Sequence, residues 1–406
     1  MTWASVSFVR LFFAIGLATL LAGCAIAPRT VPANAVAASK AIIPGIPLAR
    51  IWGDEAPAHM VADVERHMPS VKRLASSARI INGRPHVYIL ALSGGGSRGA
   101  FGAGVLKGWT ESGARPHFDL VTGVSAGAII APFAFLGPAY DHALEGIWTQ
   151  YETSELIVAQ ILPAIFGGPS LADTTPLARL IEKYVDGAFL RAIAAEYRRG
   201  RMLMIGTTNL DAERPVYWNM GEIAASRHPR KLELFRKVIL ASAAIPGAFP
   251  PVEIEVETEG QLVQEMHVDG GTTRDLFVTP GRLHLSALDR LYSSPPKRHV
   301  YIIMNSKMTP EFEPVTPTAV AIGARAVSTL IKSHDSGDLY RIRQQTLASG
   351  ADFRLAYIPP DFDRKATQAF DPIFQRALFE RGRAFGRRGE AWASDLPEPT
   401  AGLRPH

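Results

Sequence analysis

The sequence predicts an α/β fold in which helices cover both faces of a mainly parallel central sheet, giving three layers. Residues 86–92 form a nearly continuous apolar run with β-branched and aromatic members, which is typical of a strand buried on both faces. Farther along the chain, strand-like runs alternate with longer helical stretches, as in sheets whose parallel strands are joined by crossover helices. The chain has 406 residues, 47% of them hydrophobic, which is enough for one large domain with appendages.

The N-terminus has the layout of an export signal. Residues 1–23 contain an apolar run from Leu11 to Leu21 that is shorter than the ~20 residues of a membrane span. Leu21-Ala22-Gly23-Cys24 resembles the lipobox of bacterial lipoproteins, which implies that Cys24 is acylated and becomes the first mature residue. Ordinary cleavage after Ala27 and an uncleaved anchor are the alternatives. Because no Asp follows Cys24, the outer membrane is the favoured location within the cell envelope.

The elements follow in chain order. Residues 24–47 are rich in Ala and Pro and predict a tether. Residues 48–85 predict a lead-in segment, 86–282 the main domain, and 283–406 a C-terminal extension packing on that domain. We expect strands at 86–92, 118–122, 202–207, 216–219, 265–268, 300–305 and 353–358, and helices at 99–111, from 126, at 176–185, at 232–244, within 318–348 and at 372–388.

A glycine-rich loop follows the first of these strands, at Ser93-Gly94-Gly95-Gly96-Ser97-Arg98-Gly99. Glycines at this position let backbone N–H groups approach an anion near the start of a helix. The anion could be a phosphate or the oxyanion of acyl transfer, and a plain turn is the third interpretation. The spacing also matches a dinucleotide-binding fingerprint, with Asp119 twenty residues beyond the last glycine, but Asp119 sits at the start of the next strand rather than at its end.

Gly123-Val124-Ser125-Ala126-Gly127 lies between a predicted strand and a predicted helix, the context of a nucleophile elbow. The flanking glycines relieve crowding, so that Ser125 can occupy a strained turn with its hydroxyl exposed. Pro132 should kink or shorten the helix that follows.

A third motif, His267-Val268-Asp269-Gly270-Gly271, places an acid at the end of an apolar strand. An Asp that caps its own turn is the simplest interpretation of this motif in isolation. A Ser-His-Asp triad with His267 or His228 is a further alternative. No Cys or His cluster has metal-ligand spacing, so the sequence implies no metal and no cofactor.

Taken together and in this order, the three motifs resemble the patatin-like phospholipase family over roughly residues 86–280. Two intervening segments, 207–210 and 241–251, add to the likeness. The resemblance implies a patatin-like three-layer fold in which Ser125 is the nucleophile and Asp269 its partner in a two-residue dyad. It assigns the oxyanion hole to Gly94, Gly95 and Gly96, loop support to Arg98 and Gly99, the elbow to Gly123 and Gly127, and the acid turn to Gly270 and Gly271.

The expected function is a lipid acyl hydrolase, either a phospholipase A, a lysophospholipase or a broader esterase, working through an acyl-enzyme. Without a histidine the carboxylate itself must be the base, so we expect desolvation to raise the proton affinity of Asp269. Acyl transfer by the same dyad, nucleotide binding and a non-catalytic envelope lipoprotein are the alternatives. The net charge of +5 is scattered along the chain, so the expected partners are phospholipid and membrane rather than nucleic acid, and the oligomeric state stays open.

Overall fold

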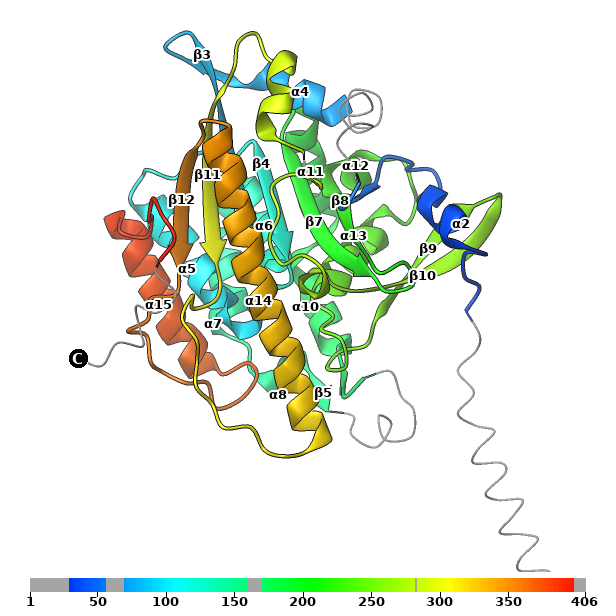
Figure 1. Cartoon of the computed structure of the whole chain (residues 1–406), viewed down its shortest axis with the longest axis vertical. Coiled ribbons are helices and arrows are strands. Elements are labelled where there is room, and N and C mark those ends of the chain that lie inside the picture. The colour runs from blue at the N-terminus through cyan, green and yellow to red at the C-terminus, as the bar shows by residue number, and fades with distance from the viewer. Residues whose placement is uncertain (1–28, 56–68, 160–169, 282, 398–406) are drawn as a thin grey trace, which may run out of the picture.

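The structure is a computed structural model that describes residues 29–55, 69–159, 170–281 and 283–397. In this part of the chain a ten-stranded sheet runs through the molecule in the order β1, β8, β7, β4, β3, β11, β12, with β2, β9 and β10 attached at its sides (Figure 1). The five strands from β7 to β12 in that order are parallel, which confirms the predicted fold class. The strands of this sheet are β1 (Arg50–Trp52), β2 (Arg79–Ile81), β3 (Arg84–Leu92), β4 (Leu120–Val124), β7 (Met202–Asn209), β8 (Arg214–Asn219), β9 (Val252–Thr258), β10 (Gln261–Asp269), β11 (Lys297–Met304) and β12 (Asp352–Tyr357).

Helices cover both faces of the sheet because alternate side chains of each strand point to opposite faces. Leu90 and Leu92 of β3 join one buried apolar cluster, whereas Ile89 and Ala91 join another. Figure 1 shows α14 in front of the sheet and α5, α6 and α7 behind it. The side of Leu90 and Leu92 carries α5 (Gly99–Glu111), α6 (Ala126–Leu136), α7 (Asp141–Thr149), α10 (Thr175–Tyr184), α11 (Gly187–Arg198), α12 (Met220–Ala225), α13 (Lys231–Ser242) and α15 (Pro372–Arg388). The side of Ile89 and Ala91 carries α4 (Pro69–Ser77), η4 (Leu285–Leu291) and α14 (Ala319–Ala348).

The residues after 283, expected to pack on the catalytic domain as an extension, enter its core. Strand β11 pairs in parallel with β3, and β12 continues the sheet beyond it. Helix α15 approaches α5 closely: a Cβ added at Gly104 would lie 2.0 Å from the carbonyl oxygen of Phe379, and one added at Gly382 would lie 2.3 Å from that of Phe101. Glycine is therefore needed on both helices, and this packing fixes the helix that follows the glycine loop.

Part of the predicted tether is folded onto the domain. Asn34 caps α2 (Ala35–Lys40) by accepting hydrogen bonds from the amides of the next turn, and Ile42 forms a backbone bridge with Glu257 of β9. Ile43 and Ile46 are buried, so their apolar side chains hold residues 41–46 against the sheet. Residues 1–23 and Cys24, with the predicted signal peptide and lipidation site, lie outside the described residues.

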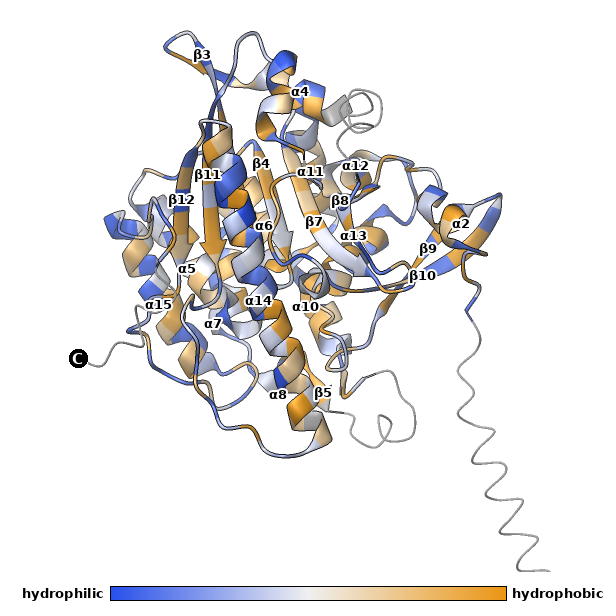
Figure 2. Ribbon diagram, viewed as in Figure 1, coloured by the Kyte–Doolittle hydropathy of each residue, from blue (hydrophilic) through white to orange (hydrophobic). Residues whose placement is uncertain are grey.

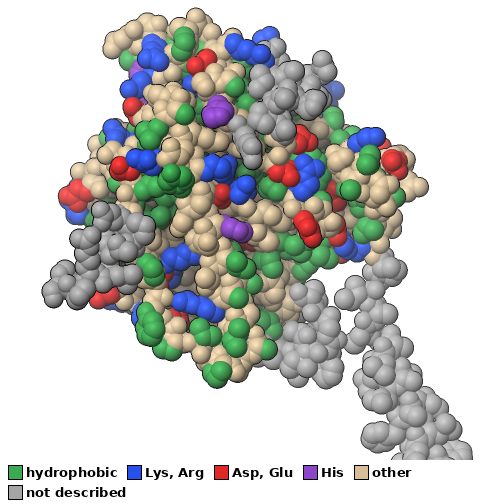
Figure 3. Space-filling model, viewed as in Figure 1, with side chains coloured by type: hydrophobic (Ala, Val, Ile, Leu, Met, Phe, Trp, Pro, Cys, Tyr) green, Lys and Arg blue, Asp and Glu red, His purple; other side chains and the backbone are tan. Residues whose placement is uncertain are grey.

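Hydropathy and charge are distributed differently in the sheet and on the surface. The central strands are apolar along most of their length, whereas α14 carries both hydrophilic and hydrophobic side chains (Figure 2). On the face drawn in Figure 3, basic and acidic side chains are interspersed rather than gathered. Within the described ranges, no helix is both long enough and apolar enough to cross a bilayer.

Candidate active site

Ser125 occupies the sharp turn between β4 and α6. Its backbone has φ 54° and ψ −122°, a conformation that L-residues rarely adopt. A Cβ at Gly123 would lie 2.3 Å from the carbonyl oxygen of Gly127, and one at Gly127 would lie 2.3 Å from that of Leu92, so both elbow glycines are required by close approach. Helix α6 runs through Pro132 and ends at Leu136, four residues later.

Ser242, at the end of α13, holds the strained turn in place. Its hydroxyl accepts a hydrogen bond from the amide of Ser125 at 2.9 Å and donates one to the carbonyl oxygen of Gly206 at 2.6 Å. Both groups are buried, so loss of this hydroxyl would leave a backbone donor and a backbone acceptor without partners. Ser242 lies within the resembling segment 241–251, but sequence reasoning gave it no role.

The register of the sheet explains why Asp269 lies beside Ser125. Strand β4 ends at Val124, which pairs with Gly206 of β7. Strand β10 then pairs with the next residues of β7, and its last residue, Asp269, lies opposite Thr207. Because β4 and β10 end at successive positions on the same edge of β7, Ser125, which follows β4, lies beside Asp269, the last residue of β10.

Asp269 is buried and positioned for proton exchange. Only 1% of it is exposed, and 6% of Ser125. Its Oδ1 accepts a hydrogen bond from the amide of Gly271 at 2.8 Å, whereas Oδ2 is buried and has no hydrogen-bond partner among the described residues. The contact with the Ser125 hydroxyl is therefore looser than a formed hydrogen bond, as is common in free enzymes.

The surroundings of Asp269 make it a stronger base than an ordinary aspartate. Burial raises its pKa, the Ser125 hydroxyl and the Gly271 amide lower it, the charge of Asp335 raises it again, and the result is a pKa of about 7. A base with a pKa near the operating pH is partly ionised there and still has appreciable proton affinity. The expectation that desolvation strengthens this carboxylate agrees with the geometry.

The glycine loop leads from β3 into η1 (Gly96–Arg98) and α5. Gly95 has φ 144° and Gly96 has φ 55°, and both line the cavity that contains Ser125 and Asp269. In the described structure their amides donate no hydrogen bond, so they are free to bind an oxyanion. Asn305, at the end of β11, holds the start of the loop through hydrogen bonds with the hydroxyl and carbonyl of Ser93, each 2.9 Å long.

The amide of Gly94 is not available as the third oxyanion donor that the sequence led us to expect. It donates to Oδ2 of Asp275 at 2.9 Å and is therefore already occupied. This corrects the predicted set, which is reduced to Gly95 and Gly96. The sequence had no signal for this contact, because Asp275 is 181 positions away along the chain.

Arg98 and Gly99 support the loop in different ways. The guanidinium of Arg98 forms an ion pair with Glu311 at 3.0 Å, on the segment that leads into α14, and lines the cavity. A Cβ at Gly99 would lie 2.3 Å from the Trp148 ring, so only glycine fits there. At the acid turn, a Cβ at Gly270 would lie 2.7 Å from the Gly206 carbonyl oxygen.

The cavity above Ser125 has a volume of about 620 Å³ and largely apolar walls. Ile245 and Pro246 form part of one wall. One face of α14 forms another, where lining residues recur at every fourth position: Ala319, Gly323, Val327, Ile331 and Asp335. The segment 283–406, whose role the sequence left open, therefore builds part of the candidate site.

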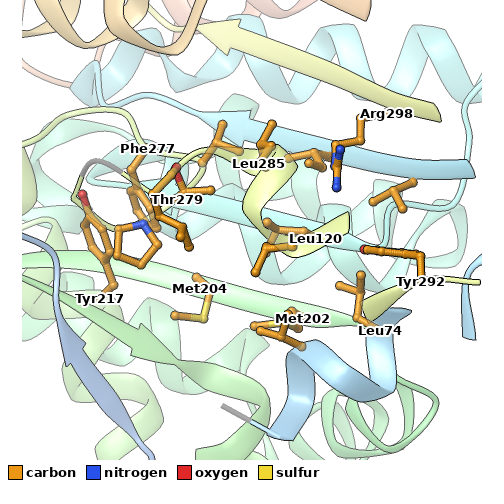
Figure 4. Close-up of a pocket in the computed structure, with 17 residues that line it drawn as sticks. Leu74, Leu120, Met202, Met204, Tyr217, Phe277, Thr279, Leu285, Tyr292 and Arg298 are labelled. Carbon is orange, nitrogen blue, oxygen red and sulfur yellow. The ribbon is translucent and has the colours of Figure 1, made fainter. Parts of the chain in front are cut away.

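A second cavity lies beneath α4 and η4 and is almost entirely apolar (Figure 4). Arg298 is the one charged group among its described lining residues, and it forms an ion pair with Asp289. No serine or carboxylate faces this cavity among those lining residues, so we assign the candidate active site to the cavity that contains Ser125.

Two alternatives lose support from the structure. The carboxylate of Asp119 accepts a hydrogen bond from the Tyr88 amide before β4 begins, which places it at the opposite edge of the sheet from the glycine loop. A ribose-binding role beside that loop is therefore not possible in this fold.

The histidine triad loses support as well. His267 is fully buried between Thr207 and Glu265, which lie 3.0 and 3.2 Å from its two ring nitrogens. Burial lowers its pKa. His228 lies beside Glu233 in a different surface pocket. In the part of the chain that is described, no group of three or more His, Cys, Asp or Glu residues is arranged to hold a metal ion.

The chain is similar to solved structures at a low level of identity and to one family model. Among solved structures, VipD from Legionella pneumophila is 13% identical, with a TM-score of 0.37, over 77% of this chain and 69% of that chain. Human GIVD cytosolic phospholipase A2 is 12% identical, with a TM-score of 0.35, over 77% of this chain and 55% of that chain. No curated protein sequence matches. The family model for patatin-like phospholipase matches residues 90–280, the range that holds the glycine loop, the elbow and the acid turn, and the chain therefore carries a domain of the patatin-like phospholipase family.

Proposed function

We propose that this chain hydrolyses acyl esters of lipids, with Ser125 as the nucleophile and Asp269 as the general base. The family supports lipid hydrolysis in general terms. The finer assignment is carried by one observation. Strand β10 pairs with the same edge of β7 as β4, directly after the point where β4 ends, and this brings a buried carboxyl group to the strained serine. The apolar cavity above this pair suits an acyl chain.

The first step would transfer the acyl group to the enzyme. The Ser125 oxygen attacks the ester carbon while Oδ2 of Asp269 takes the hydroxyl proton. The amides of Gly95 and Gly96 bind the oxyanion, each contributing roughly 3–4 kcal/mol by comparison with donors in other hydrolases. The proton then passes from Asp269 to the leaving alkoxide as the ester bond breaks.

The second step would release the acid. A water molecule loses a proton to Asp269 and attacks the acyl-Ser125 ester, and the proton returns to the serine oxygen as that bond breaks. An alcohol in place of water would give acyl transfer through the same residues. Product analysis separates the two reactions, because hydrolysis releases a free fatty acid and transfer yields a new ester.

We further propose that Cys24 is lipidated and that the domain is held in the cell envelope, with the outer membrane favoured. The support is the order Leu21-Ala22-Gly23-Cys24 after a short apolar run. Mass spectrometry of the N-terminus of membrane-extracted protein is expected to find acyl chains on Cys24. A mature chain that starts at Pro28 would overturn this proposal.

The test of the enzymatic proposal uses the full chain purified in detergent. Wild type, Ser125→Ala, Asp269→Asn and the surface controls Ser336→Ala and Asp363→Asn are assayed on phosphatidylcholine and phosphatidylglycerol vesicles and on a short-chain nitrophenyl ester. Loss of turnover in the two site variants, with normal circular dichroism and active controls, is expected. Full activity in either site variant would overturn the assignment of its residue.

A further inference from the structure

Two buried carboxyl groups lie in the active-site cavity besides that of Asp269. Asp275 follows the acid turn and is 1% exposed, and Asp335 lies on α14 and is 6% exposed. One oxygen of each has a donor: the Gly94 amide for Asp275 at 2.9 Å, and the Ser306 hydroxyl for Asp335 at 3.4 Å. The other oxygen of each, Oδ1, is buried without a hydrogen-bond donor among the described residues.

The two carboxyl groups line the same cavity, and each alters the pKa of the other through a hydrogen bond between their side chains when one of them is protonated. Two ionised carboxylates in contact away from water repel strongly, and such pairs hold one proton between them. We propose that Asp275 and Asp335 share one proton and that this acid pair positions the glycine loop for catalysis. The inference rests on the proposed hydrolysis and extends it, because it assigns two positioning residues.

The contacts of Asp275 show how the pair would act on the oxyanion donors. Oδ2 of Asp275 holds the Gly94 amide, one peptide before Gly95 and Gly96. Oδ1 fits tightly, because a Cβ at Gly94 would lie 2.4 Å from it and one at Gly271 would lie 2.9 Å from it. A small movement of the Asp275 side chain would therefore shift the loop that carries the proposed donors.

Helix α14 holds Asp275 from the other side. The backbone amide of Asp275 donates to Oδ2 of Asp338 at 3.0 Å, and Arg341 holds Asp338 through a 3.0 Å ion pair. Asp335 lies one turn before Asp338 on the same helix. The helix that lines the acyl cavity is thus linked through the acid pair to the glycine loop.

The charges around the pair favour retention of its proton. Burial raises the pKa of both Asp275 and Asp335. The charges of Asp335 and Asp269 raise the pKa of Asp275 further, whereas the hydrogen bond with Asp275 lowers the pKa of Asp335. The charge of Asp338 also raises the pKa of Asp335, whereas the Lys332 ammonium lowers it. Other charged or titratable groups on the surrounding elements include Arg98 on the loop with its partner Glu311, Arg274 beside the acid turn, Lys307 after β11, and His334 and Arg341 on α14.

We therefore expect kcat to fall at alkaline pH, where the shared proton dissociates. When the shared proton dissociates, two adjacent carboxylates repel, Asp275 moves, and the loop loses its position. In Asp335→Asn an amide N–H replaces the shared proton and cannot dissociate in this range, so the hydrogen bond to Asp275 remains. In Asp335→Ala that hydrogen bond is absent at every pH.

The first test measures kcat and KM of the full-length protein for a soluble short-chain nitrophenyl ester as a function of pH. Asp335→Asn is expected to lose the alkaline fall, and its kcat at neutral pH should exceed that of Asp335→Ala about tenfold with little difference in KM. Ser336→Ala, an exposed neighbour on α14, is the matched control and should follow wild type. Superimposable pH profiles for wild type and Asp335→Asn would overturn the proposal.

A second measurement does not depend on turnover. Infrared spectroscopy above the pKa of about 7 of Asp269 should find a protonated carboxyl band in wild type that disappears in both Asp275→Asn and Asp335→Asn. Absence of the band in wild type would overturn the shared proton. A wild type with the band but without ester hydrolysis would instead overturn the proposed function and, with it, the catalytic role of the pair.

Discussion

Substitution of Asp269 by Asn should remove activity and at the same time stabilise the fold. In the unfolded chain the carboxyl group ionises near its ordinary pKa of 3.8, whereas in the folded protein burial holds the pKa at about 7. Between these two values the unfolded chain releases a proton that the folded protein keeps. The free energy of unfolding of wild type therefore falls as the pH rises through this window.

The size of the effect follows from the same two values. One pKa unit corresponds to about 1.4 kcal/mol, so a rise from 3.8 to about 7 corresponds to about 4 kcal/mol as an upper limit. Asn cannot ionise, and its Oδ1 can still accept the hydrogen bond from Gly271. The stability difference between Asp269→Asn and wild type should thus be close to zero below about pH 4 and reach up to about 4 kcal/mol above about pH 7.

Urea unfolding of wild type, Asp269→Asn and the exposed control Asp363→Asn at about pH 4, 6 and 8 measures this difference directly. The control should track wild type at each pH. A difference that does not grow with pH, or an Asp269→Asn protein less stable than wild type at about pH 8, would refute the reasoning about the buried carboxyl group.

Three further outcomes follow from the site. Ser242→Ala should lower kcat about tenfold and the free energy of unfolding by about 1–3 kcal/mol, measured by ester hydrolysis and urea unfolding, because the Ser125 amide loses its acceptor; unchanged values would contradict that role. Gly94→Ala should lower kcat more than KM, since the new Cβ would lie 2.4 Å from Oδ1 of Asp275; wild-type kinetics would count against a tightly held loop. The kcat/KM of wild type should rise as Asp269 ionises around its pKa of about 7, and a profile that is flat from about pH 5 to 8 would exclude this carboxylate as the base.

Local patterns in the sequence predicted much of the fold. The helices expected at 99–111 and 372–388 have those bounds in the structure, because glycine or proline punctuates their ends and apolar residues recur at helical spacing. The strand before the glycine loop and the strand-turn-helix around Ser125 were likewise visible from short apolar runs and paired glycines.

Other features depend on contacts between distant segments. Strand β10 runs from Gln261, although only residues 265–268 were predicted, because its first residues are held by pairing with β9. The Ala- and Pro-rich composition of residues 24–47 suggested a tether, and no local signal indicated that Ile43 and Ile46 would find an apolar surface to pack on.

The same holds for the site. Four residues that the sequence singled out, Ser125, Asp269, Gly95 and Gly96, line one cavity, whereas the contact that occupies Gly94 joins segments 181 positions apart. Asp335 had one usable signal: it continues the row of small and apolar residues at every fourth position of α14, where an acid is unexpected.

Covalent labelling by a fluorophosphonate tests the central claim most directly, because the reagent reports an activated serine without requiring knowledge of the substrate. Intact-mass and peptide mass spectrometry should find one adduct, on Ser125, in wild type, and much slower labelling in Asp269→Asn. Labelling at a different residue, or an equal rate in Asp269→Asn, would contradict the activation of Ser125 by Asp269.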